Sequence, residues 1–198
     1  MSKISTGNTT VNVMITGVGG QGVLLASELI SKAALDEGYD IKKSEVHGMA
    51  QRGGSVVSNV RFGEKVFSPL ISQGEADILL SFERMETLRW LDYIHDGTVI
   101  IANQQKIVPM TVTTTNTGYP EDVQAILEGI SDKVYMVDAL DIARQAGNIR
   151  TANVALIGAM SAHLDIPLER WEQVIKEQVP PKTLEANMKA FRLAAEGQ

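Results

Sequence analysis

Val13-Met14-Ile15-Thr16-Gly17-Val18-Gly19-Gly20-Gln21-Gly22-Val23-Leu24-Leu25 is an apolar segment that runs through a glycine-rich turn into a helix. Gly17, Gly19 and Gly22 occupy the first, third and sixth places of the turn, where glycine allows positive φ, close approach of a ligand and tight packing of helix on strand. The free N–H groups at the start of the helix would point at a phosphate, with the positive end of the helix dipole behind them. The stretch predicts a phosphate-binding turn, although an empty strand-to-helix turn needs the same glycines.

The length and composition of the chain favour one domain. It has 198 residues, of which 44% are hydrophobic, and this is enough to build a core around a sheet. No apolar run is long enough to cross a bilayer, and residues 1–10 lack the basic start and apolar middle of a secretory signal. We therefore expect a cytoplasmic protein with a single domain over residues 1–198, disordered at residues 1–10.

The absence of cysteine limits the chemistry of the chain. It excludes disulfides, thiolate-bound zinc and cysteine-ligated iron–sulfur clusters within this polypeptide, so any cluster belongs to another chain. The three histidines show no metal-ligand spacing, and no serine lies in a nucleophile elbow. We expect no metal site in this chain.

The charge of the chain argues against nucleic-acid and membrane partners, because the formal net charge is −6. Between residues 41 and 70, however, five basic residues stand against two acidic ones. This basic segment suits an anionic ligand or an acidic partner, and an ordinary solvated surface has the same composition.

Apolar runs alternate with segments of helical periodicity along most of the chain, which is typical of an α/β fold. The predicted architecture is a three-layer α/β/α sandwich with a mostly parallel, Rossmann-like sheet, an antiparallel hairpin inserted after the second strand, and a helical C-terminal part over residues 151–198. We expect strands at residues 12–16, 39–46, 55–62, 65–70, 76–82, 97–103, 107–114 and 133–137, with the hairpin formed by 55–62 and 65–70. We expect helices at residues 23–35, 83–94, 120–130, 151–164, 167–179 and 182–195, with one more after Asp138 or Asp141.

Two segments carry the candidate binding residues. The glycine turn contributes Gly17, Gly19, Gly20, Gln21 and Gly22, and the Gln21 amide can donate a hydrogen bond to a phosphate or carbonyl oxygen. The loop after the second predicted strand contributes His47, Gln51, Arg52, Gly53 and Gly54. Arg52 has the planar fork that clamps a phosphate or carboxylate, and His47 is a catalytic candidate as well as a structural one.

Acidic residues leave two further readings open. A dinucleotide-binding enzyme would place an acid at the end of its second strand for the ribose hydroxyls, and Asp40 and Glu45 are near that place, although a turn or an exposed strand accounts for both. Ser81-Phe82-Glu83 follows a buried strand at the edge of the sheet where open α/β sheets bind ligands. Helix capping is the simpler role for Glu83.

Three segments resemble one known family, the gamma-domain proteins of the 2-oxoacid ferredoxin oxidoreductases, and in particular its indolepyruvate-type beta subunits. These segments are the glycine turn, residues 44–57 with the run His47-Gly48-Met49-Ala50-Gln51-Arg52-Gly53-Gly54, and residues 76–89. Thr151-Ala152-Asn153 with Gly158-Ala159 extends the resemblance toward the C-terminus. In pyruvate-type relatives the loop keeps the Arg-Gly-Gly part and differs before it.

The resemblance implies a subunit of an enzyme that converts an arylpyruvate to an acyl-CoA while ferredoxin receives electrons. It implies that thiamine diphosphate, Mg²⁺ and the iron–sulfur clusters belong to a larger partner subunit, in agreement with the lack of cysteine here. It also implies that the glycine turn and the Arg52 loop contact coenzyme A, and that the isolated chain is inactive. Two alternatives remain: an NAD- or FAD-binding oxidoreductase, and an assembly module that binds no ligand.

Overall fold

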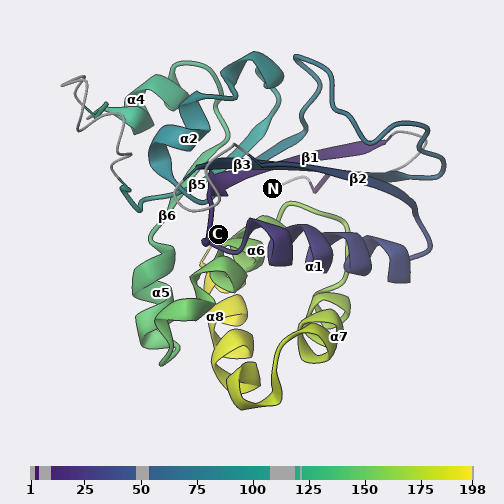
Figure 1. The fold of residues 1–198 in the computed structure, drawn as a ribbon, viewed down its shortest axis with the longest axis vertical. Helices are drawn as coiled ribbons and strands as arrows, with labels where there is room; N and C mark the ends of the chain where they lie inside the picture. Colours follow the sequence, from purple (N-terminus) through teal and green to yellow (C-terminus); the bar gives the residue numbers. More distant parts are fainter. Residues whose placement is uncertain (1–2, 5–9, 48–53, 108–118, 121, 198) are drawn as a thin grey trace.

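The computed structural model describes residues 3–4, 10–47, 54–107, 119–120 and 122–197. One six-stranded sheet has the order β2-β3-β1-β4-β5-β6, with bounds β1 Val11–Val18, β2 Asp40–His47, β3 Ser55–Gly63, β4 Ile78–Ser81, β5 Val99–Asn103 and β6 Val134–Val137. Helices α2 (Arg84–Leu88) and α4 (Val123–Glu128) cover one face of the sheet, and the other α-helices among the described residues lie on the opposite face (Figure 1). The predicted three-layer fold is confirmed.

The central strand of the sheet is β1, in which all eight residues are buried. It pairs with β4 in parallel and with β3 in the antiparallel direction, and β5 and β6 continue the parallel part. Alternate side chains enter two cores: Val13 and Ile15 face the layer of α1 (Val23–Asp36), whereas Met14 faces the layer of α2 and α4. The carboxyl ends of β1, β4 and β5 therefore share one edge of the sheet.

The predicted hairpin has the wrong partner. Ser55 to Gly63 forms β3, but β3 pairs with β2 on one side and β1 on the other, so residues 65–70 have no strand to join and run as a loop. The antiparallel hairpin is formed by β2 and β3 instead. Residues 65–70 cannot pair with β3 because β1 and β2 already occupy both edges of that strand.

Two other predictions need adjustment. The helix expected over residues 83–94 is a short α2 followed by a 3-10 turn, η1 (Leu91–Tyr93), because the N–H groups of Arg89, Trp90 and Tyr93 bond to carbonyls three residues back. Most of the strand expected at residues 107–114 lies outside the described residues, as do residues 1–2 and 5–9 of the segment 1–10 that we expect to be disordered. Ile4, by contrast, forms a parallel bridge with Leu164.

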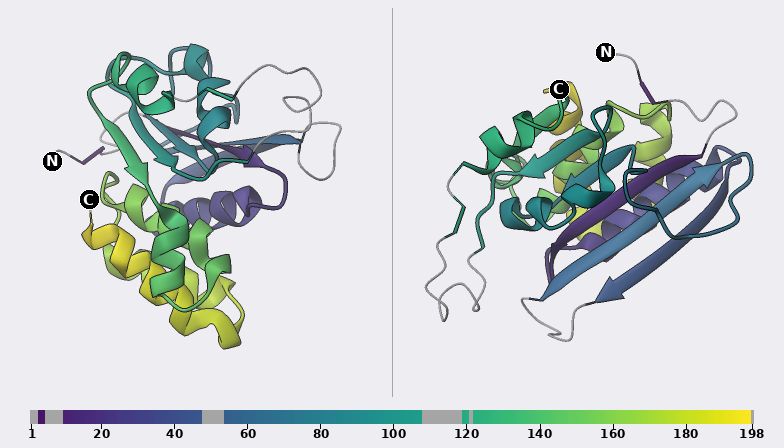
Figure 2. Two further views of the ribbon diagram at one scale, coloured as in Figure 1. Left: turned by 90° about the vertical axis from the view of Figure 1, so that its left-hand side faces the viewer. Right: turned by 90° about the horizontal axis from the view of Figure 1, so that it is seen from above.

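The C-terminal third is helical, as predicted, and packs beneath α1 (Figure 2). Its elements are α5 (Ala139–Gln145), η2 (Ile149–Thr151), α6 (Ala152–Ser161), α7 (Leu168–Gln178), η3 (Pro181–Thr183) and α8 (Leu184–Glu196). Asp138 caps α5 by accepting the N–H of Asp141, which is one of the two caps that the sequence offers. Helix α6 is buried from Val154 to Ser161, whereas Ala152 and Asn153 in its first turn are half-buried.

Candidate ligand-binding site

A pocket of about 390 Å³ opens at the edge where the parallel strands end. It lies where the chain connections leave the sheet toward opposite faces, the place at which open α/β sheets bind ligands. Its walls come from the glycine turn, the ends of β4 and β5, and the segments that begin α5 and α6. The lining residues are Gly20, Gln21, Gly22, Phe82, Asn103, Gln105, Leu140, Ile149, Arg150, Ala152, Asn153 and Leu156.

The electrostatics of this pocket favour an anion. Helix α1 begins at Gly22 without a side-chain cap, and its first turn contains no acidic residue. Helix α6 also begins there with no acid in its first turn, but it continues from η2, where Asn148 accepts the N–H of Arg150, and Asn153 Oδ1 accepts the N–H of Val154. Arg150 is exposed and lines the same pocket, and none of the described residues that line it carries a carboxylate. The uncapped start of α1, the start of α6 and a guanidinium therefore converge on one space, and the start of α1 supplies the free N–H groups.

The glycines of the turn have structural reasons of their own. A Cβ on Gly17 would lie 2.8 Å from Cβ of Phe82, because β1 and β4 approach closely there. Gly22 has φ +91°, and its Cβ would lie 2.5 Å from Nδ2 of Asn153. Gly20 has φ +99° with open space around it. Packing and turn geometry explain these glycines without a ligand, whereas the pocket and its charge favour one.

The side-chain amide of Gln21 stabilises the glycine turn through three hydrogen bonds. Its Oε1 accepts the N–H of Val18 at 2.7 Å, and its Nε2 donates to the carbonyl of Phe82 at 2.8 Å and to Oε1 of Gln105 at 3.0 Å. The amide that the sequence offers to a ligand is thus engaged with β4 and with the segment after β5. Gln21 shapes the pocket wall in this structure.

The second predicted segment begins and ends beside the glycine turn. The carbonyl of Gly54 accepts the N–H of Gly19 at 2.9 Å, which ties the start of β3 to the turn. His47 ends β2 at the same edge of the sheet. Gln51, Arg52 and Gly53 lie outside the described residues, so their roles stay predictions.

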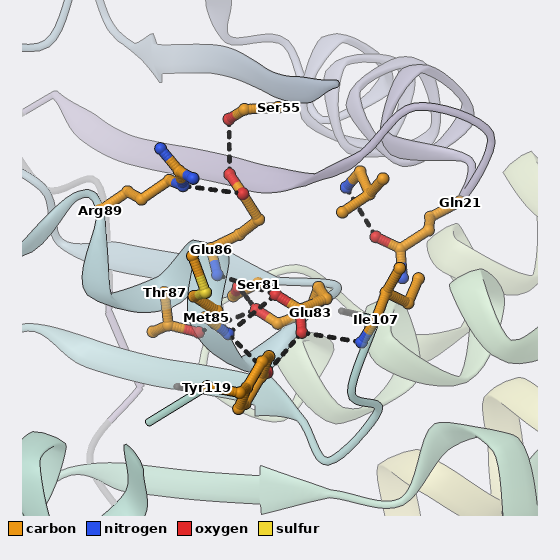
Figure 3. Close-up of polar contacts among 11 residues, drawn as sticks. Gln21, Ser55, Ser81, Glu83, Met85, Glu86, Thr87, Arg89, Ile107 and Tyr119 are labelled. Atoms are coloured by element: carbon orange, nitrogen blue, oxygen red, sulfur yellow. Dashed lines mark hydrogen bonds and ion pairs between the residues drawn. The ribbon is translucent and has the colours of Figure 1, made fainter. Parts of the chain in front are cut away.

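Glu83 is a buried carboxylate at the end of β4, only 1% exposed. Its Oε2 accepts the N–H groups of Met85 at 2.8 Å and Glu86 at 3.0 Å, which confirms the predicted cap of α2. Its Oε1 accepts the N–H of Ile107 at 3.0 Å and the hydroxyl of Tyr119 at 2.5 Å (Figure 3). Burial and this hydrogen bond raise the pKa of Tyr119. Glu83 therefore joins α2 to residues on both sides of segment 108–118.

Glu86 is a second buried acid, which the sequence reasoning missed. Its Oε2 accepts the hydroxyl of Ser55 at 2.5 Å, and its Oε1 pairs with Nε of Arg89 at 2.9 Å (Figure 3). Burial raises the pKa of Glu86, even though Ser55 and Arg89 favour its charged form. Glu86 thus connects α2 to the first residue of β3.

The candidate ribose-binding acids lie away from the pocket. Asp40 begins β2 and pairs with Gly63, so it is at the opposite edge of the sheet. Glu45 accepts the hydroxyl of Ser27 in α1 and pairs with Lys43, and β3 separates its strand from β1. The arrangement that a dinucleotide-binding enzyme uses for the ribose is therefore absent from the described residues.

Arg150 and Asn153 are pocket residues that the sequence analysis did not select. Thr151-Ala152-Asn153 carries part of the family resemblance, and this was the sequence signal that could have identified them.

In the described part of the chain, no group of three or more His, Cys, Asp or Glu side chains is arranged to hold a metal ion. None of the described helices is long and apolar enough to cross a membrane.

Comparisons with known proteins give this fold a family. The family model described as "Pyruvate ferredoxin/flavodoxin oxidoreductase" matches residues 12–197. The chain is 45% identical over 187 residues to an indolepyruvate oxidoreductase subunit IorB of Thermococcus kodakarensis, covering 92% of this chain and 93% of the relative.

Solved structures share the fold. The gamma subunit of a keto/oxoacid ferredoxin oxidoreductase from Geobacter sulfurreducens matches with a TM-score of 0.70 at 22% identity, over 94% of this chain and 96% of that one. The 2-oxoglutarate:ferredoxin oxidoreductase of Magnetococcus marinus, solved with 2-oxoglutarate, coenzyme A and succinyl-CoA, matches with a TM-score of 0.71 at 18% identity, over 96% of this chain and 31% of that one. By its sequence and its fold, this chain belongs to the pyruvate ferredoxin/flavodoxin oxidoreductase family, as a subunit of a 2-oxoacid:ferredoxin oxidoreductase.

Proposed function

We propose that this chain completes a thiamine-dependent oxidoreductase of the indolepyruvate, or arylpyruvate, type and helps to bind coenzyme A during oxidative decarboxylation to an acyl-CoA. The observation that carries the proposal is the pocket with the uncapped N-terminus of α1, the start of α6 and Arg150 at its wall. Coenzyme A presents phosphate groups, which such a site attracts. The homologous fold of M. marinus was solved with coenzyme A bound to its complex.

The pocket fits one part of coenzyme A. Its volume of about 390 Å³ suits a phosphate-bearing portion of the molecule, with the rest left to other surfaces of the complex. Leu140, Ile149 and Leu156 give one wall an apolar character. The predicted second contact is the segment with His47, Gln51, Arg52, Gly53 and Gly54, because Gly54 is hydrogen-bonded to the glycine turn.

The remaining chemistry belongs to companion subunits in this proposal. Iron–sulfur clusters need thiolate ligands, and this chain has no cysteine. A larger subunit would hold thiamine diphosphate with Mg²⁺ and the clusters, and ferredoxin would take electrons from the assembled complex. The residues of this chain bind and orient coenzyme A and transfer no electron themselves.

The test compares arginine variants in the assembled enzyme. Arg150→Ala removes a charge from the pocket and should raise the Michaelis constant for coenzyme A about tenfold, since one charge-assisted hydrogen bond contributes about 1.5–3 kcal/mol. Arg52→Ala should act in the same direction. Arg144→Ala is the matched control, because Arg144 is an exposed arginine of α5 outside the pocket lining. An unchanged constant for both test variants would refute the role in coenzyme A binding.

Calorimetric titration of the same complex separates the alternatives. Binding of coenzyme A that weakens in the Arg150→Ala complex supports the proposal. Binding of NAD or FAD in its place would indicate a dinucleotide enzyme, against the positions of Asp40 and Glu45. If none of the three ligands binds, the chain is an assembly module with an empty turn.

A further inference from the structure

Glu86 in α2 is a buried acid that the proposed binding site leaves unused. Its side chain is 2% exposed, and it is not among the residues that line the pocket. Glu83 already supplies the N-cap of α2, so the helix does not need a second acid for capping. Burying a carboxylate costs free energy, and apolar side chains often replace a buried ion pair without loss of stability. The stability of α2 alone therefore does not account for an acid at this position.

Both carboxylate oxygens of Glu86 have partners that orient it. Oε1 pairs with the guanidinium of Arg89, one turn later in α2, at 2.9 Å. Oε2 accepts the hydroxyl of Ser55, which lies outside the helix, at 2.5 Å (Figure 3). A hydrogen bond to a carboxylate is shorter and stronger than one between neutral groups. The pair with Arg89 therefore directs Glu86 toward Ser55.

Ser55 lies where β3 meets the glycine turn. It is the first residue of β3, and its partner Val18 is the last residue of β1. One position beyond this pair, the carbonyl of Gly54 accepts the N–H of Gly19 at 2.9 Å. Because this carbonyl belongs to the same peptide unit as the nitrogen of Ser55, a side chain that holds Ser55 also holds the carbonyl against the turn.

The glycine turn depends on such contacts from outside. Gly22 has φ +91°, and glycine loses more conformational freedom on folding than any other residue. On one side of the turn, Nε2 of Gln21 donates to the carbonyl of Phe82, just before α2, at 2.8 Å. On the other side the turn is bonded to Gly54. The start of α2 therefore supports both sides, through the backbone of Phe82 and the side chain of Glu86.

We propose that Glu86 is a positioning residue for the coenzyme A site. Through Ser55 and Gly54 it holds the glycine turn, and with it the free N–H groups at the start of α1, in the place where they meet a phosphate. Donors that are held in place before the ligand arrives bind it more tightly, because less conformational entropy is lost on binding. This inference rests on the proposed function of the pocket, and Glu86 acts through the backbone from outside it.

The test measures the Michaelis constants for coenzyme A and for the 2-oxoacid in the assembled enzyme. Ser55→Ala and Glu86→Ala each remove the link and should raise the constant for coenzyme A about fivefold or more, with kcat and the constant for the 2-oxoacid unchanged. The double variant should show no further rise, because both substitutions break the same hydrogen bond. Glu86→Gln keeps an oxygen that accepts the hydroxyl of Ser55, so it should restore most of the affinity.

Two control variants separate positioning from stability. Asp77→Ala removes a carboxylate that accepts the N–H of Asn12 at 2.7 Å, and Ser131→Ala removes a buried hydroxyl that donates to the carbonyl of Thr98 at 2.8 Å. Both bonds lie at the amino ends of the parallel strands, at the opposite edge of the sheet from the pocket. The controls should lower the temperature of thermal unfolding and leave the constant for coenzyme A unchanged.

An unchanged constant for coenzyme A in Ser55→Ala would overturn the positioning role, and this variant decides the outcome if Glu86→Ala does not assemble. Additive rises in the double variant, or an equal rise in the controls, would also overturn it. A rise in Arg150→Ala with none in Ser55→Ala leaves the coenzyme A site standing without Glu86. If the constant is unchanged in the Arg52, Arg150 and Ser55 variants alike, coenzyme A binding by this chain is refuted as well.

Discussion

Gly22 is the residue where the glycine turn meets the C-terminal helices. We expect Gly22→Ala to lower the free energy of unfolding by about 2 kcal/mol or more, because an L-residue at φ +91° is strained and its Cβ would collide with Asn153. Urea denaturation measures the loss. Gly38→Ala is the control for backbone strain alone, since Gly38 has φ +89° and nothing within 4 Å. Equal losses in the two variants would contradict the contact with Asn153.

Glu86 should make stability depend on pH. Burial raises its pKa above the ordinary value of 4.5, so the folded protein holds this proton more tightly than the unfolded chain does. The free energy of unfolding should therefore fall as the pH rises from 4.5 through the folded pKa, and level off above it. Glu86→Gln removes this term, so its stability relative to the wild type should increase with pH across that window.

The measurement for Glu86 is a series of urea denaturations at several pH values. Glu64→Gln, at an exposed position after β3, is the control and should track the wild type at every pH. A constant difference between Glu86→Gln and the wild type would show that the charge of Glu86 costs the fold nothing.

Single residues show where prediction from the sequence ends. The glycine turn, the cap by Glu83 and the cap by Asp138 follow from local sequence, because each depends on neighbours a few residues away. The partners of Gln21 do not, because Phe82 and Gln105 reach it only through the pairing of separate strands. Arg150 was missed for the same reason, since η2 brings it to the pocket from far along the chain.

At the level of elements, α6 and α8 pack with almost no space between them. A Cβ on Gly158 would lie 2.3 Å from the backbone carbonyl of Phe191, and a backbone atom cannot rotate away. Gly158→Ala should therefore destabilise the protein by about 3 kcal/mol, the upper part of the usual range for overpacking. Chemical denaturation tests this, with Gly129→Ala as the control because its Cβ would meet Ile126 O at an ordinary 3.4 Å. A loss in Gly158→Ala no larger than in the control would argue against this close packing.

The wrong prediction of the hairpin shows that local sequence identifies strands but not their partners. Residues 55–62 and 65–70 both look like strands, and alternation of apolar residues does not say which strands are neighbours. Long-range pairing of β3 with β1 and β2 decided the matter, and side chains of Arg61 and Asp40 satisfied the backbone of the second segment. The parallel strands were predictable from their short apolar runs, and the C-terminal helices from the helical spacing of their apolar residues and the prolines between them.

For the whole molecule, we expect no turnover by the isolated chain. It contains no cysteine for a cluster, and the proposed pocket offers only binding groups. Mixing it with the companion subunits should restore reduction of an electron-accepting dye that depends on a 2-oxoacid and coenzyme A. The control is the companion subunits alone; full activity without this chain would contradict its proposed role.

The bridge at Ile4 has a consequence for the order in which the protein forms. The N–H of Ile4 donates to His163 O at 2.8 Å, and the carbonyl of Ile4 accepts the N–H of Asp165 at 3.0 Å. During synthesis on the ribosome, the fourth residue emerges long before its partners exist. These two hydrogen bonds can form only after Asp165 has been translated, so the segment around Ile4 docks late in cotranslational folding.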